Sequence, residues 1–338
     1  MMGRNRPKVD AFVEAVERRL APLQPPQGKT AQERRRNAAA FDPVMTAELG
    51  IAPVPAATEE HTIPVPGHPD ARLRVYWPTP ERAAADAGLP VLVYFFGGGF
   101  ELAGIDWVWW DAMFRERARD AGIIVVAGEY SHAPEVTYPA QPEQCWAVFE
   151  WAATNARELG GDPDRLALGG GSAGGNLAAV TALMNRDRKN RPVRLQVLEM
   201  PLLDMTGAHL EPEAQSSLVP KALFRRFARG IIAQYLGKDP ATAREPYASP
   251  LLASSLRGLP PAVIYTAELD ALRGDGEAYA RALADAGVPA TCLRVIGQSH
   301  GSGTYRGHVP AADHLHRELV AALRTLHDEP VVYPDVER

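Results

Sequence analysis

A serine stands in a glycine-rich turn within RLALGGGSAGGNLAA (165–179), where an apolar run gives way to a helical pattern. Gly170, Ser172 and Gly174 satisfy G-x-S-x-G, the nucleophile elbow, in which a sharp strand-to-helix turn exposes the serine hydroxyl. The same turn also satisfies G-x-G-x-x-G at 169–174, the dinucleotide-binding turn. The turn alone therefore leaves two alternatives, a catalytic nucleophile and a pyrophosphate cradle.

An acid and a histidine follow at the ends of two later predicted strands. AVIYTAELD ends in Asp270, and TCLRVIGQSHG brings His300 after one more helix and one more strand. A dinucleotide turn normally opens its domain, with an acid about 20 residues further on, whereas four predicted strands precede this turn and Glu199 comes late. The order favours Ser172 as nucleophile, with Asp270 orienting His300 and Glu268 as a rival acid.

Three consecutive glycines end the apolar run VLVYFFGGGFE (91–101). Such a loop suits either a phosphate cradle or an oxyanion hole, because its amides can point at a negative charge. In a nucleophile elbow one oxyanion donor is the amide after the serine, here Ala173, and the others come from an earlier strand-to-helix loop. Residues 97–99 fit that role. The only GKT, at 28–30, has no strand before it and lacks the first glycine of a P-loop.

Apolar runs alternate with helical patterns from about residue 72 onward. This order predicts an α/β fold with a mostly parallel sheet flanked by helices, because nearly all-apolar strands are typical of sheets covered on both faces. The predicted strands are 72–77, 91–96, 123–130, 165–170, 194–200, 262–268 and 291–297. The predicted helices are 109–121, 135–159, 173–187, 275–287 and 311–326.

Two segments interrupt this alternation. Residues 1–55 are helical and then rich in Pro and Ala, and residues 204–250 hold a helix (219–236) where a short crossover would suffice. Long insertions at the carboxyl edge of a sheet are often lids. We therefore expect one helical cap built from both segments, on a core formed by 56–203 and 251–338.

Composition excludes several classes of partner. The net charge of −5 gives no electrostatic case for nucleic acid or an anionic membrane. No stretch reaches the ~18 apolar residues of a membrane span, and the N-terminus has no secretory pattern. Cys145 and Cys292 suggest buried, reduced thiols and hence a cytoplasmic protein. We expect no metal and no cofactor, and we interpret the remaining clustered histidines as surface residues: His308, His314 and His316.

Aromatic residues near the glycine loop have two interpretations. Trp107, Trp109 and Trp110 follow the loop in IDWVWWD, where they could pack into the core or form a wall of the substrate pocket. Phe224 and Phe227 present the same choice on the predicted cap, with core packing favoured.

The chain resembles the hormone-sensitive-lipase-like (bacterial family IV) esterases of the α/β-hydrolase superfamily over most of residues 70–325. Four blocks carry the resemblance: GGGF (97–100), GEYSHAPEVTYPAQPEQC (128–145), GGGSAGGN (169–176) and ELDALRGDGEAYA (268–280). It implies an α/β-hydrolase fold with a helical cap and hydrolysis of carboxylic esters without a cofactor. It also implies oxyanion donors at Gly98, Gly99 and Ala173.

Three residues depart from the family pattern. Phe96 stands where the family has His, Gly171 where it has Asp, and Ala271 where it usually has Pro. The first two lie beside the oxyanion hole rather than in the triad, and Phe96 joins the tryptophans as a candidate pocket residue.

The sequence thus predicts a serine carboxylesterase for small to medium esters. Two alternatives remain open: a non-hydrolytic enzyme on this scaffold (a dehydratase, cyclase or acyltransferase), and a ligand-binding protein without turnover. The family also allows a homodimer.

Overall fold

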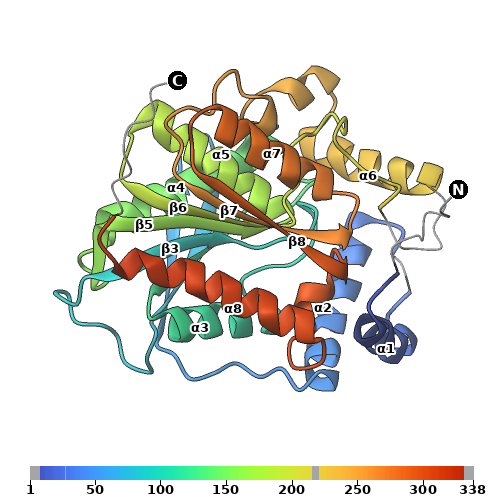
Figure 1. Ribbon diagram of the computed structural model, residues 1–338, viewed down its shortest axis with the longest axis horizontal. Helices are drawn as coiled ribbons and strands as arrows, with labels where there is room; N and C mark the ends of the chain where they lie inside the picture. The colour runs from blue at the N-terminus through green and yellow to red at the C-terminus, as the bar shows by residue number, and fades with distance from the viewer. Residues whose placement is uncertain (1–7, 27, 215–220, 331–338) are drawn as a thin grey trace, which may run out of the picture.

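An eight-stranded sheet forms the centre of the molecule in the computed structural model, which describes residues 8–26, 28–214 and 221–330 (Figure 1). The strand order is β1-β2-β4-β3-β5-β6-β7-β8, antiparallel from β1 through β2 to β4 and parallel from β4 onward. The strands are β1 (Thr58–Val65), β2 (His68–Tyr76), β3 (Leu89–Phe95), β4 (Ile124–Glu129), β5 (Gly161–Gly171), β6 (Val193–Glu199), β7 (Ala262–Leu269) and β8 (Ala290–Ser299). This architecture confirms the predicted α/β fold.

The burial of each strand explains whether it could be predicted from the sequence. β3 is almost wholly buried, and its run LPVLVYF reads as apolar on both faces. β1, which the sequence analysis did not predict, is an edge strand with the mixed sequence TEEHTIPV, and most of its residues remain partly or fully exposed. An edge strand buries only part of its surface, so β1 can carry polar residues. These residues gave no apolar run from which a strand could be predicted.

Helices cover both faces of the sheet (Figure 1). α3 and α8 lie on one face and contact each other, while α4, α5 and α7 lie on the opposite face. Their bounds are α3 (Val108–Ala121), α4 (Ala140–Asn155), α5 (Ala173–Arg188), α7 (Arg273–Asp285) and α8 (Pro310–Arg324). Apolar strands between two helical layers produce one continuous hydrophobic core.

Three further helices gather at the end of the sheet toward which β8 points: α1 (Ala11–Leu20), α2 (Ala31–Glu48) and α6 (Lys221–Leu236) (Figure 1). α1 has its own small apolar cluster, in which Val13 and Val16 pack with Val309 and Ala312 at the start of α8. The side chains of Phe224 and Phe227 lie outside the described residues.

α2 is tied to the core by charged side chains. The Asp42 carboxylate accepts the amides of Val108 (2.6 Å) and Trp109 (3.3 Å) at the start of α3. Arg34 donates to both carboxylate oxygens of Glu101, at 2.6 and 2.8 Å, just after the glycine loop. The N-terminal segment is therefore fixed beside the carboxyl ends of the strands.

Candidate active site

Ser172 occupies a strained turn between β5 and α5. Its backbone has φ 53° and ψ −116°, a conformation that costs energy for any residue with a side chain. A Cβ on Gly170 would lie 2.1 Å from the carbonyl oxygen of Gly174, and a Cβ on Gly174 would lie 2.1 Å from that of Phe95. Both flanking positions therefore require glycine, which explains the motif spacing sterically.

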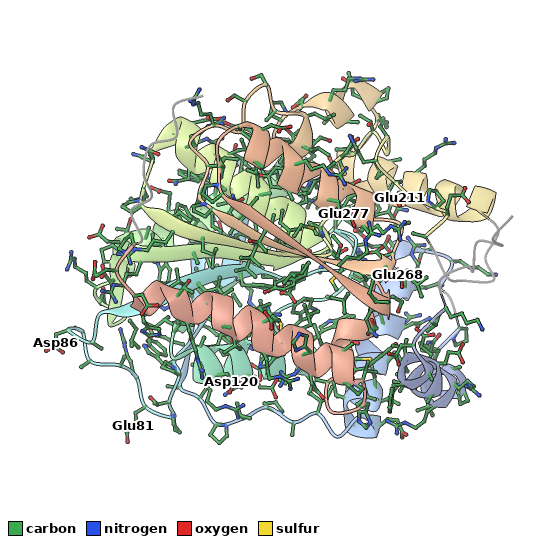
Figure 2. All side chains as sticks on the ribbon, viewed as in Figure 1. Glu81, Asp86, Asp120, Glu211, Glu268 and Glu277 are labelled. Atoms are coloured by element: carbon green, nitrogen blue, oxygen red, sulfur yellow. The ribbon has the colours of Figure 1, made fainter. Side chains whose placement is uncertain are left out.

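The structure brings Ser172, His300 and Asp270 together from the ends of β5, β8 and β7. His300 Nε2 lies 3.0 Å from Ser172 Oγ, and Nδ1 lies 2.7 Å from Asp270 Oδ2. The other carboxylate oxygen of Asp270 accepts the Leu272 amide at 2.9 Å, which fixes the carboxylate. The rival acid Glu268 instead accepts the Gly297 amide at 2.9 Å; Figure 2 marks it at the β7–β8 end of the sheet.

The electrostatics suit His300 as a base. Desolvation alone would lower the pKa of His300, but the charge of Asp270 and the hydrogen bond to it outweigh that effect, so the pKa of His300 is raised above its ordinary value of 6.5. The Asp270 side chain is only 4% exposed, whereas that of His300 is 42% exposed and accessible to substrate. A buried carboxylate thus holds an accessible imidazole.

The glycine loop lies directly against Ser172. A Cβ on Gly97 would lie 3.3 Å from the Cβ of Ser172, so the loop can approach this closely only without a side chain. Gly98 (φ 145°) and Gly99 (φ 61°) adopt backbone conformations that favour glycine. Within the described part of the chain, no acceptor takes the N–H of Gly98, Gly99 or Ala173. Two of these amides thus belong to residues that line the cavity, Gly98 and Gly99, and the third belongs to Ala173, which follows Ser172.

Phe96 supports this loop from behind instead of lining the cavity. Its ring is fully buried and stacks on Tyr130, with ring centroids 4.5 Å apart. The Tyr130 hydroxyl donates to the Phe96 carbonyl at 2.9 Å, so a tyrosine braces the loop. The expectation of Phe96 in the pocket wall does not match this position, because its ring faces the interior. The brace by Tyr130 was not predicted.

A cavity of about 520 Å³ opens over Ser172. Of the three tryptophans, Trp109 and Trp110 line this cavity. Trp107 does not belong to the described residues that form the cavity wall. Trp107 precedes α3 and packs at the edge of the core. Segment 204–250 contributes Leu210 and residues of α6 to the wall. The wall is largely apolar, including Leu102, Met113, Leu202, Ile231, Ile232 and Leu315.

One side of the cavity is polar, which the sequence did not predict. Arg117 of α3 and Glu199 at the end of β6 form an ion pair at 2.7 Å, and the Tyr94 hydroxyl donates to Glu199 at 2.7 Å. Arg117 lies in the charged stretch RERARD, which looks like a solvated helix face. Arg117 differs from a solvated charged residue in its position on the buried face of α3, which the sequence pattern does not reveal.

His316 corrects another expectation. It lines the cavity with its side chain only 10% exposed, and its Nε2 lies 2.8 Å from Asp120 of α3. It is therefore not a surface histidine. Figure 2 labels Asp120 on the face of the sheet covered by α3 and α8. Burial lowers the pKa of His316, although the hydrogen bond to Asp120 acts in the opposite direction. The lowered pKa favours the neutral imidazole.

The described residues form neither a metal-binding cluster nor a membrane-spanning helix. Within 8–26, 28–214 and 221–330, no three His, Cys, Asp or Glu side chains group as a metal site would require. In the same ranges, no helix is both long and apolar enough to cross a bilayer.

A nucleophile elbow at the carboxyl edge of this sheet defines the class of α/β hydrolases. A family model described as alpha/beta hydrolase fold matches residues 92–304. Carboxylesterase NlhH from Mycobacterium tuberculosis is 38% identical over 276 residues, which cover 80% of this chain and 83% of the relative. Ethyl acetate hydrolase from Pseudomonas putida is 31% identical over 87% of this chain and 90% of its own length.

A solved esterase structure is also similar to this chain. The hyperthermophilic esterase from the archaeon Pyrobaculum calidifontis superposes with a TM-score of 0.81 at 32% identity, covering 95% of this chain and 99% of that one. The chain therefore belongs to the hormone-sensitive-lipase-like esterases of the α/β-hydrolase superfamily, which confirms the family predicted from the sequence.

Proposed function

We propose that this carboxylic ester hydrolase is a serine carboxylesterase that works through an acyl-enzyme on Ser172. The observation that carries the proposal is the position of His300, which lies 3.0 Å from Ser172 Oγ and 2.7 Å from Asp270 within an open cavity. Esterase relatives at 38% and 31% identity support ester hydrolysis over the non-hydrolytic alternatives.

The mechanism uses groups of the chain itself. His300 takes the Ser172 proton as Oγ attacks the ester carbonyl, and Asp270 stabilises the imidazolium that forms. The amides of Gly98, Gly99 and Ala173 bind the developing oxyanion, and loss of one such donor typically costs about 10²–10³ in rate. His300 then protonates the leaving alcohol. In the second half, His300 activates water to attack the acyl-enzyme and release the acid.

We infer that the cap comprises residues 1–55 and 204–250, on a core of 56–203 and 251–338. Two contacts support this division: Arg34 of α2 donates to Gln234 of α6 at 3.2 Å, and Ile231 of α6 lines the cavity above Ser172. A cap of this kind limits the size of the ester that can enter. The cavity of about 520 Å³ and the mostly apolar wall suit small to medium esters.

Hydrolysis of p-nitrophenyl esters with graded acyl lengths tests the proposal. We expect turnover that peaks at short to medium acyl chains and falls at least 10³-fold in Ser172→Ala. Measurable turnover that survives unchanged in Ser172→Ala would refute the role of Ser172. Covalent labelling without turnover of simple esters would instead favour a specialised non-hydrolytic enzyme.

We further propose that the protein is cytoplasmic and forms a homodimer. The free thiols of Cys145 and Cys292 are consistent with a cytoplasmic protein. A homodimer through β8 is supported by the position of that strand at the open edge of the sheet, with Leu293 40% exposed and Ile296 66% exposed. Light scattering on wild type and Ile296→Lys tests it; a monomeric wild type would contradict the dimer.

A further inference from the structure

One ring nitrogen of His316 in α8 is accessible from the cavity. The His316 side chain is 10% exposed and lines the cavity over Ser172, and its Nε2 lies 2.8 Å from Oδ2 of Asp120. The other ring nitrogen, Nδ1, has no hydrogen-bond partner among the described residues. Nδ1 is also not enclosed by protein, in contrast to Nε2 of His132, which is buried without a partner. Because the ring forms part of the cavity wall, Nδ1 is the nitrogen that a bound molecule can reach.

The bond to Asp120 determines whether Nδ1 donates or accepts. Burial opposes the charged form of Asp120, but hydrogen bonds from Arg119 and His316 outweigh burial and lower the pKa of Asp120. Asp120 is therefore a carboxylate, which can only accept, so the single proton of the neutral imidazole lies on Nε2. In this tautomer Nδ1 carries a lone pair and no proton. The nitrogen at the cavity is thus a hydrogen-bond acceptor.

The charges around His316 favour a neutral donor as its partner. Burial and the positive charges of Arg306 and Arg117 oppose protonation of the ring, and both arginines line the cavity. The same charges would repel an ammonium group that approached Nδ1. The nearby carboxylates of Glu116 and Glu199 are already paired with these arginines. A neutral hydroxyl group can donate to Nδ1 without bringing a charge into this site.

The apolar wall beside His316 makes this acceptor selective. Ala312 and Leu315 line the cavity from the same helix, and Met113 lines it from α3. These side chains offer no hydrogen bond, so a hydroxyl placed against them alone would lose its bonds to water without replacement. Nδ1 of His316 allows a substrate hydroxyl to be buried here with a partner.

We propose that His316 is a specificity-determining residue, whose Nδ1 accepts a hydrogen bond from a hydroxyl group carried by the ester. The inference rests on the proposed esterase function and names a substrate class of that same site. His300 already serves Ser172 as the base, so His316 acts on the choice of substrate. Asp120 is a positioning residue, because it acts through the His316 ring.

Hydroxylated esters and their methyl ethers test the proposal, since an ether can accept a hydrogen bond but cannot donate one. Ethyl 6-hydroxyhexanoate, 8-hydroxyoctanoate and 10-hydroxydecanoate are each compared with the corresponding methoxy ester. Monoacetates of the diols of the same lengths, with their methyl ethers, test the alcohol side. Acid release at constant pH gives kcat/KM, and the measured quantity is the ratio of kcat/KM for the hydroxy ester to that for its ether.

His316→Leu removes the acceptor. At one or more chain lengths, we expect the ratio to be about fivefold or more higher in wild type than in this variant, because the hydroxyl loses its partner. His314→Leu is the matched control, since His314 lies on the same helix with its side chain 64% exposed. It should leave the ratio unchanged.

Asp120→Asn tests the tautomer and does not depend on whether His316→Leu folds. The amide group of the variant can donate to Nε2, so the imidazole proton can move to Nδ1. Nδ1 would then donate to an ether oxygen, and we expect the ratio to fall about threefold or more as the ethers become better substrates. A purely structural role of Asp120 would change kcat/KM equally for both esters.

Three outcomes overturn the inference. Equal ratios in wild type, His316→Leu and Asp120→Asn at every chain length would mean that solvent alone satisfies Nδ1. An equal fall in His316→Leu and His314→Leu would assign the effect to the helix and not to the acceptor. An unchanged ratio in Asp120→Asn with a fall in His316→Leu would contradict the proposed tautomer. If wild type hydrolyses none of these esters and Ser172 takes no covalent label, the proposed esterase function itself fails.

Discussion

His300 is the residue whose protonation should control activity. Its pKa is raised above 6.5 because the charge and hydrogen bond of Asp270 outweigh desolvation. In the proposed mechanism the neutral imidazole is the active form, so kcat/KM should fall as pH drops through an apparent pKa above 6.5.

Asp270→Asn tests the cause of that shift. The variant removes the charge that raises the pKa and disturbs the tautomer, so we expect kcat to fall by roughly 10³–10⁴ and the residual acid limb to move to lower pH. The measurement is a pH profile of p-nitrophenyl butyrate hydrolysis for both proteins. Glu268→Gln is the control, since Glu268 binds the Gly297 amide and not His300. An acid limb at the same pH in Asp270→Asn would contradict the assignment.

Replacing Phe96 with the histidine that the family has at this position should lower both stability and activity. Its ring is fully buried against Tyr130, and Tyr130 already holds the loop carbonyl. Phe96→His would bury a polar ring in an aromatic site, at a cost of about 1–3 kcal/mol unless it finds a partner. We expect a lower free energy of unfolding in urea and reduced kcat. Raised kcat would show that the loop lacks a brace.

The proximity of three of the candidate site residues could be predicted from their order along the chain. The order of Ser172, Asp270 and His300 follows from where parallel strands end, so their proximity could be predicted. Arg117 and Glu199 could not be paired, because neither lies in a motif and 82 residues separate them. Phe96 was misplaced because a buried aromatic and a pocket aromatic look the same in sequence.

At the scale of elements, α2 and α3 depend on one buried carboxylate. Asp42 accepts the first amides of α3, whose own start lacks a side-chain cap. Asp42→Ala should therefore lower stability by about 0.5–2 kcal/mol, the usual cost of a lost helix cap. Thermal unfolding measures this. Since α3 also carries Trp109 and Trp110 of the cavity wall, KM for medium-chain esters should rise as well.

Asp42→Asn is the matched control for that experiment. Its amide oxygen can still accept the Val108 amide, so most of the stability should remain. Equal unfolding temperatures for wild type and Asp42→Ala would show that the contact contributes nothing.

Element boundaries were predictable where packing is uniform. The buried strands β3 and β7 read as apolar runs, and the sequence placed both within about two residues. β1 was missed because its polar residues carry no clear alternation. α4 begins at Ala140 and not at 135, since residues 135–139 form turns before the helix.

At the scale of the whole molecule, the site exists because distant segments meet at one sheet edge. The ends of β3, β5, β7 and β8 supply the glycine loop, Ser172, Asp270 and His300, while α6 contributes to the wall beside them. α1 and α2 reach this edge through contacts that no local pattern encodes, including Asp42 to α3 and the packing of α1 on α8. The fold class was therefore predictable, and the shape of the cavity was not.

The proposed mechanism depends above all on acylation of Ser172. Intact-mass and peptide-mapping mass spectrometry after treatment with a fluorophosphonate measures this directly in wild type, Ser172→Ala and His300→Ala. We predict one adduct per chain in wild type, located on Ser172, no adduct in Ser172→Ala, and at least 10²-fold slower labelling in His300→Ala. An adduct on another residue, or labelling of Ser172 at the same rate without His300, would contradict the roles proposed for Ser172 and His300.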